Sequence, residues 1–156
     1  MKALIIYWST YRNNTEKIAE IFAQRMKADV INIKNTKEIA ADGYDIIGFG
    51  SGVYKESMAP KIFNCVENLE LAGKDVFVFS TSGVGGKHYN KKLMKQLETK
   101  GANIKGSYAC KGSFSSKEFS NIKIFEIMSK FAQGHPDAKD LRKAELFINK
   151  IMEVTE

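Results

Sequence analysis

The stretch Tyr-Trp-Ser-Thr-Tyr-Arg-Asn-Asn-Thr, residues 7–15, lies between an apolar run at 3–7 and a helical pattern that starts at Thr15. This order predicts a strand, a turn rich in hydroxyl and amide groups, and then a helix. Such a turn directs backbone N–H groups and the positive end of a helix dipole at one point in space. That arrangement binds phosphate, so we expect the rest of the chain to support a phosphate-bearing ligand.

The composition is that of one ordinary globular domain. A chain of 156 residues with 44% hydrophobic and 27% charged residues can bury a core, and we expect one domain over residues 1–156. The two cysteines, Cys65 and Cys110, suggest neither a disulfide framework nor a metal site. We find no signal-peptide pattern and no apolar run near the roughly 20 residues that span a bilayer. We therefore expect a cytoplasmic protein without a membrane span or a metal.

The formal net charge of +6 indicates an anionic ligand, an acidic protein partner or nucleic acid. The sequence has no arginine-rich stripe, zinc-ligand spacing or aromatic–basic sheet motif, so we expect no nucleic-acid partner. Most lysines, such as Lys91, Lys92 and Lys95, are expected to solvate helix faces. We expect a monomer or a weak dimer.

Apolar runs alternate with helical patterns along the chain. Strands are expected at residues 2–8, 29–33, 44–50, 75–79 and 103–110. Helices are expected at 15–26 with Asn14 as N-cap, after Pro60, at 89–100, and after Asp137. Residues 34–43 indicate a connector with at most one weak helical turn. Residues 112–136 resist assignment, apart from a short helix expected between 122 and 131. This alternation predicts a parallel sheet that helices cover on both faces.

Three segments with small and polar residues follow the first, third and fourth expected strands. They are Ser9–Thr15, Ser51–Tyr54 and Thr81–Gly86. In a doubly wound sheet of order 2-1-3-4-5, these strand ends meet at the switch point where ligands bind. Together the three segments therefore predict one binding site at the carboxyl edge of the sheet.

These motifs resemble those of the flavodoxin family. The segment YWSTYRNNTEKIA at 7–19 is similar to the family's phosphate loop, and FGSGVY at 49–54 and FSTSG at 79–83 are similar to its two flavin loops. The segment GHPD at 134–137 also resembles the approach to the family's last helix. The resemblance covers nearly the whole chain. It implies a flavodoxin-like three-layer α/β/α sandwich with a five-stranded parallel sheet, noncovalent FMN, and electron transfer through the flavin.

The resemblance also implies a role for each loop residue. Hydroxyl groups for the FMN phosphate would come from Ser9, Thr10 and Thr15, and backbone N–H groups from Tyr11, Arg12, Asn13, Asn14 and Thr15. Contacts to the flavin ring would come from Ser51, Gly52, Val53 and Tyr54 on one side and from Thr81, Ser82, Gly83 and Val84 on the other. The sequence departs from the family pattern at Asn13, where glycine is expected, and at Arg12. Asparagine tolerates the left-handed conformation, so the turn is expected to survive.

Several residues have an ordinary structural alternative. The first loop contains residue types that also occur in turns and helix caps. Tyr54 either stacks on the flavin ring or is an ordinary surface tyrosine. Arg12 either binds the phosphate or points to solvent. Trp8, Cys110 and His135 are expected to serve packing or structure.

The prediction for function is an FMN-binding carrier of one or two electrons between redox partner proteins, with acidic partners favoured by the net charge. It needs no catalytic residue. Two alternatives remain at this stage: an FMN-dependent quinone or protoporphyrinogen oxidoreductase, and an interaction module that has lost FMN.

Overall fold

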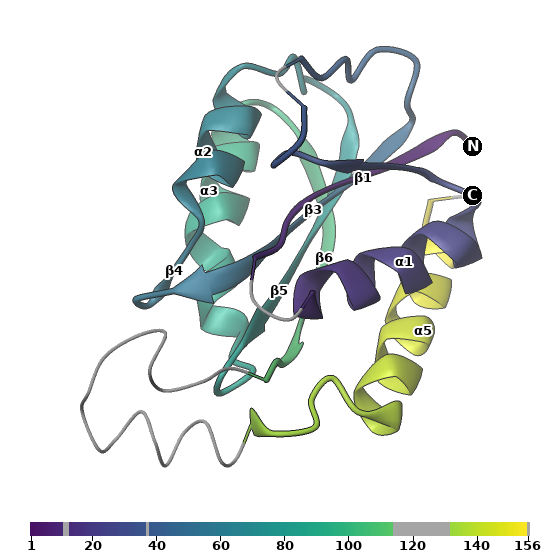
Figure 1. Ribbon diagram of the computed structural model, residues 1–156. Helices are drawn as coiled ribbons and strands as arrows, with labels where there is room; N and C mark the ends of the chain where they lie inside the picture. The colour runs from purple at the N-terminus through teal and green to yellow at the C-terminus, as the bar shows by residue number, and fades with distance from the viewer. Residues whose placement is uncertain (11–12, 37, 114–131, 156) are drawn as a thin grey trace.

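Five parallel strands form the centre of the fold (Figure 1). They are β1 (Ala3–Trp8), β2 (Asp29–Asn32), β3 (Ile46–Tyr54), β5 (Asp75–Ser82) and β6 (Asn103–Lys111). The structure is a computed structural model that describes residues 1–10, 13–36, 38–113 and 132–155. The strands follow the order β2-β1-β3-β5-β6, which confirms the predicted flavodoxin-like order of the five parallel strands.

A sixth strand, β4 (Ser57–Met58), pairs antiparallel with the end of β3. The prediction of only five strands was therefore incomplete, and β3 continues to Tyr54 instead of ending at residue 50. The connection consists of Lys55 and Glu56, whose φ angles are 49° and 67°. Two positive φ angles in a two-residue loop match the twist of the flanking strands and close a hairpin.

The helices cover both faces of the sheet (Figure 1). On one face lie α1 (Asn14–Met26) and α5 (Ala138–Glu153); on the other lie α2 (Pro60–Glu67) and α3 (Lys91–Thr99). The helix predicted at 89–100 begins instead as a 3₁₀ turn, η1 (Lys87–Asn90). Asn90 is buried there, and its side chain donates a hydrogen bond to the carbonyl of Tyr108 at 2.9 Å. This bond fixes the turn against β6.

Each face of the sheet has its own hydrophobic core. Phe22 of α1 is fully buried, and its ring centroid lies 5.5 Å from that of Phe77 and 5.1 Å from that of Phe79. Phe77 and Phe79 lie beside Gly48 and Gly50 of β3, where a Cβ atom would overlap their rings. The second core joins α2 and α3 to residues of β1, β3 and β5 that point to the other face.

The ends of the helices agree only in part with prediction. Asp137 caps α5 and exchanges hydrogen bonds with Asp140, as the sequence indicated. Asn14 was wrongly predicted as the N-cap of the first helix, because Asn13 takes that position and Asn14 begins α1. The short helix predicted between 122 and 131 lies outside the described residues.

The connection from β2 to β3 contains no helix in its described parts, residues 33–36 and 38–45. The connection instead contains single hydrogen-bonded turns, in which Asn35 N–H donates to the carbonyl of Asn32 at 3.1 Å and Tyr44 N–H to that of Ala41 at 3.4 Å. Ile33 and Ile39 pack loosely against the second core and remain partly exposed. Among the described residues of this connection, no helix covers this face of β1 and β2.

Candidate functional site

The first predicted segment leads into a helix N-terminus without a side-chain cap. Asn13 has φ 54° and ψ 31°, which is the left-handed conformation that the sequence required at this position. Its side chain makes no capping hydrogen bond to any described residue. The first N–H groups of an α-helix lack partners within the helix, so α1 offers donors and the positive end of its dipole to an external anion. Tyr11 and Arg12 lie outside the described residues, and their roles stay predictions.

Two hydrogen bonds between side chains join the three predicted segments. Thr15 Oγ1 lies 2.9 Å from Thr81 Oγ1, and Thr10 Oγ1 lies 2.8 Å from Tyr54 Oη. The first pair is buried, with Thr15 exposed by 1% and Thr81 by 4%, whereas Thr10 is exposed. The segments Ser9–Thr15, Ser51–Tyr54 and Thr81–Gly86 therefore meet at the carboxyl ends of β1, β3 and β5.

Ser51 serves the scaffold through its side chain. It is fully buried, its hydroxyl donates to the carbonyl of Gly52 at 2.6 Å, and the N–H of Ala59 donates to it at 2.9 Å. Ala59 directly precedes α2, so this hydroxyl ties the end of β3 to the start of that helix. A contact from Ser51 to a ligand would accordingly use its backbone, as the family resemblance implied.

The Tyr54 side chain folds back over Gly52. A Cβ atom on Gly52 would lie 2.7 Å from Tyr54 Oη, so a larger residue there would displace the tyrosine. Val53, next to it, is partly exposed and pairs with Met58 of β4. The hairpin thus holds the aromatic ring of Tyr54 at the rim of the site, next to the first loop.

The third segment is a tight turn that presents an apolar side chain. Ser82 Oγ accepts a hydrogen bond from the N–H of Gly85 at 2.8 Å. Gly85 has φ 68°, and a Cβ atom on it would lie 2.9 Å from the backbone nitrogen of Lys111. Gly83 is partly exposed, and the Val84 side chain beside it is 46% exposed. The turn therefore needs glycine at 85 and places Val84 in contact with solvent.

Glu16, the acidic residue in the first turn of α1, is hydrogen-bonded to a side chain of β1. Glu16 Oε1 accepts a hydrogen bond from Tyr7 Oη at 2.7 Å. Burial and the neighbouring Glu16 raise the pKa of Tyr7, so the phenol remains a proton donor at neutral pH. This bond directs the Glu16 carboxylate toward Tyr7.

Asn14 links the first loop to the residues on both sides of segment 114–131. Its Nδ2 donates to the carbonyl of Ser113 at 2.7 Å, while Ser113 N–H donates to the carbonyl of His135 at 2.8 Å. Asn14 is buried, and its Oδ1 has no hydrogen-bond partner among the described residues. The sequence does not indicate this link, because an asparagine after a helix cap gives no signal for a partner 99 positions away.

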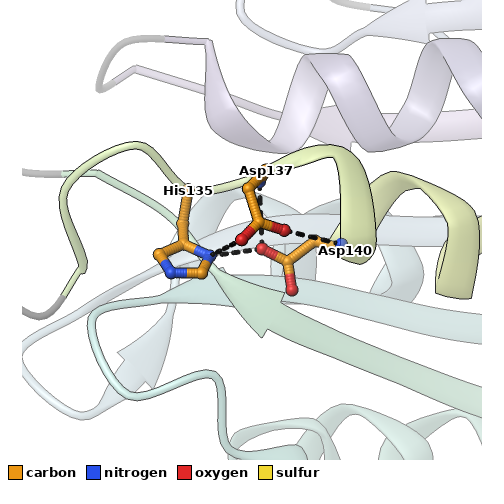
Figure 2. Close-up of side chains that lie close together, drawn as sticks. All are labelled: His135, Asp137 and Asp140. Carbon is orange, nitrogen blue, oxygen red and sulfur yellow. Dashed lines mark hydrogen bonds and ion pairs between the residues drawn. The ribbon is translucent and has the colours of Figure 1, made fainter.

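Three polar side chains meet where α5 begins, as Figure 2 shows. His135 Nδ1 is hydrogen-bonded to Asp140 Oδ2, and Asp137 Oδ2 lies 3.6 Å from the same nitrogen. The carboxylates also accept backbone hydrogen bonds from each other's residues, at 2.8 Å and 3.0 Å. These bonds, with Asp140 N–H the main cause, lower the pKa of Asp137. The cluster fixes the chain at the helix start, which agrees with the structural role predicted for His135.

The two cysteines form no disulfide, and their thiols are protonated at neutral pH. Burial raises the pKa of Cys110 to about 12 and that of Cys65 to about 11. Thiols with such pKa values are poor nucleophiles at neutral pH. The predicted packing role of Cys110 is confirmed, since it is 5% exposed in the core between the sheet and α5. Trp8, predicted as a core residue, is instead only partly buried.

The fold and the three loops define a doubly wound α/β protein whose first helix starts without a side-chain cap at the switch point of the sheet. A family model described as a flavodoxin domain matches residues 4–149. The uncharacterized protein MJ0298 of Methanocaldococcus jannaschii is 35% identical over 154 residues, which cover 97% of this chain and 99% of that protein. The chain belongs to the flavodoxin family.

Solved structures share the fold at low sequence identity. A flavodoxin from the domain Archaea has a TM-score of 0.67 and 18% identity, and the match covers 99% of each chain. A flavoprotein in complex with FMN from Lactobacillus acidophilus NCFM has a TM-score of 0.56 and 22% identity, over 68% of this chain and 91% of that chain. No helix in the described part of the chain has the length and apolar character needed to cross a membrane.

Proposed function

We propose that this protein binds FMN noncovalently and carries one or two electrons between redox partner proteins. The observation that carries the proposal is the meeting of an uncapped helix start with the loops after β3 and β5, fixed by the Thr15–Thr81 and Thr10–Tyr54 pairs. Nucleotides bind at this position in doubly wound sheets. Membership in the flavodoxin family and the FMN complex of the similar Lactobacillus flavoprotein support FMN as the nucleotide.

The residues of this chain fit the phosphate end of FMN. Ser9, Thr10 and Thr15 supply hydroxyl groups beside the N-terminus of α1, where the dipole favours a negative charge. Each threonine hydroxyl that pairs with a second hydroxyl can still use its remaining hydrogen-bonding capacity, because a hydroxyl donates once and accepts twice. The acid in the first turn, Glu16, is bound to Tyr7. This set of donors supports a phosphate site at the start of α1.

The other two loops fit the flat ring of a flavin. Tyr54 offers an aromatic face at the rim of one loop, and Val84 offers an exposed apolar side chain on the other. Ser51 Oγ and Ser82 Oγ fix the backbone of these loops, so Gly52 and Gly83 keep their peptide groups in place for the polar edge of the ring. When bound, FMN supplies the electron transfer itself. The protein binds, orients and partly shields it.

The charge of the chain supports acidic redox partners. The net charge is +6, and Lys87 is exposed directly after the third loop. Lysines near the docking surface accelerate association with an acidic protein, and salt screens this attraction over about 10 Å. The rate of electron exchange with an acidic partner should therefore fall as the ionic strength rises.

The test is the visible spectrum and FMN titration of the purified full-length chain. We expect added FMN to bind with quenching of its fluorescence, and riboflavin, which lacks the phosphate, to bind at least ~10-fold more weakly. A protein that binds neither compound would overturn the proposal and favour the interaction module. Equal affinity for FMN and riboflavin would refute the phosphate site at α1. Steady quinone reduction by NAD(P)H without a partner protein would favour the oxidoreductase over the carrier.

A further inference from the structure

A groove lies on the face of the sheet opposite α1. It has a volume of about 590 Å³ and lies between the end of β1, the connector after β2, and α2. The groove exists because no helix covers β1 and β2 in the described part of the β2–β3 connection. Its volume is within the range of small-molecule sites, roughly 300–1,000 Å³. The helix start proposed for the FMN phosphate belongs to α1, which covers the other face.

The groove has an apolar floor. Trp8 at the end of β1, Ile33 after β2 and Leu69 after α2 all line it. Leu69 is buried, whereas Trp8 and Ile33 are only partly buried, although both are large apolar side chains. The partly buried indole of Trp8 lines the groove, and an indole can stack on another flat ring. The floor therefore fits a planar apolar group.

The rim of the groove is positive. Lys34 and Lys61 line it from opposite sides, and among the described lining residues there is no carboxylate. The ammonium groups of these two lysines have no ion pair or hydrogen bond with any described residue. Asn64, on the same turn of α2 as Lys61, adds a side-chain amide that can donate to an anion. Within the described residues, the two lysine charges of the rim are thus without a partner.

We propose that this groove binds a small aromatic carboxylate, with the ring against Trp8 and the carboxylate between Lys34 and Lys61. A cationic rim favours an anion over a neutral analogue of the same shape, and the apolar floor favours a ring over a short aliphatic acid. The site is separate from the proposed flavin site, and its occupation does not depend on FMN.

The experiment uses the full chain and 2-naphthoate as the probe, with neutral 2-naphthamide as the matched compound. Calorimetry is expected to show that 2-naphthoate binds about 3- to 10-fold more tightly, because each exposed charge pair contributes modestly. The Lys34→Gln/Lys61→Gln variant should lose this preference. Lys95→Gln, which removes an exposed lysine from α3 outside the groove, should retain it.

Two further measurements locate the probe. Trp8 is the chain's single tryptophan, so 2-naphthoate should change its fluorescence in the flavin-free protein. Calorimetry repeated with excess FMN should give the same affinity for 2-naphthoate. Competition with FMN would place the anion at the flavin site and overturn the proposal. Equal binding of naphthoate and naphthamide, or an unchanged preference in the double variant, would overturn it as well. Failure of FMN itself to bind would affect only the proposed function.

Discussion

Substitution of Thr15 and Thr81 by valine tests whether one buried hydroxyl pair holds the loops of the site together. The two oxygens are 2.9 Å apart, and the residues are 1% and 4% exposed. Valine has the shape of threonine, so Thr15→Val or Thr81→Val alone leaves the other hydroxyl buried without its partner. Each single change should lower the free energy of unfolding by about 1–3 kcal/mol. The double change removes both polar groups together and should cost less than about 1 kcal/mol.

Urea denaturation of the four proteins in this cycle gives the coupling energy between the two residues. We expect a favourable coupling of at least about 1 kcal/mol, because the two single losses share one cause and the double variant no longer carries it. Single losses that simply add in the double variant would refute the reasoning, since they would show that each hydroxyl contributes independently of the other.

The same variants separate the structural role of Thr15 from its proposed role at the phosphate. A hydrogen bond to a charged group contributes about 1.5–3 kcal/mol, so Thr15→Val should weaken FMN binding about 10- to 100-fold. The double variant should recover stability but not affinity, and riboflavin, which has no phosphate, should bind the unchanged protein and Thr15→Val similarly. If the double variant regained full affinity for FMN, Thr15 would position the loop without touching the phosphate.

Four further outcomes are expected. Asn13→Ala should reduce the free energy of unfolding, measured in urea, by about 1 kcal/mol, because alanine adopts φ 54° less readily than asparagine. Asn13→Gly should not reduce it, and equal urea midpoints for the two variants would contradict this reasoning. Phe22→Ala should cost about 3–5 kcal/mol and Phe22→Leu less, and a small loss for alanine would show that the aromatic core collapses around the gap. The lowered pKa of Asp137 stabilises the fold at pH values above about 4, and this contribution is lost as the pH falls through the folded-state pKa. Asp137→Asn should therefore flatten the acid limb of a plot of urea midpoint against pH, and an unchanged limb would exclude Asp137 as its cause. With FMN bound, spectroelectrochemistry should give a lower reduction potential less negative than that of acidic flavodoxins, and a potential equal to or below theirs would refute the effect of the net charge of +6.

The positions of the five parallel strands could be predicted because their signals are local, whereas their order was implied by the resemblance to the flavodoxin family. Residues such as Val76, Phe77 and Val78 form an unbroken apolar run, which indicates a strand buried on both faces. Helical patterns between such runs require right-handed crossovers, and few arrangements satisfy them. The three loops could be placed together because parallel strands that follow one another in this way all end at the same edge of the sheet.

The hairpin after β3 could not be predicted in the same way. Two-residue hairpin loops usually contain asparagine, aspartate or glycine, because both residues take positive φ angles. Here the loop is Lys55–Glu56, which carries no such signal. The cap of α1 shows a related limit: Asn13 and Asn14 are the same residue type, so only the observed conformation tells which of them precedes the helix.

Contacts between distant residues lie beyond what spacing along the chain can indicate. Nothing near Thr15 in the sequence selects Thr81 as its partner, and nothing near Asn14 selects Ser113. Such pairs depend on how far each loop extends past the end of its strand. A difference of a single residue in that length changes which side chains meet. The groove beside Trp8 has the same origin, because it results from a connector that forms no helix across its described residues. Its positive rim combines Lys34 of that connector with Lys61 of α2. Family membership accounts for the loops at the helix start of α1, whereas the groove depends on this chain's own connector, so the two sites can be tested and can fail independently.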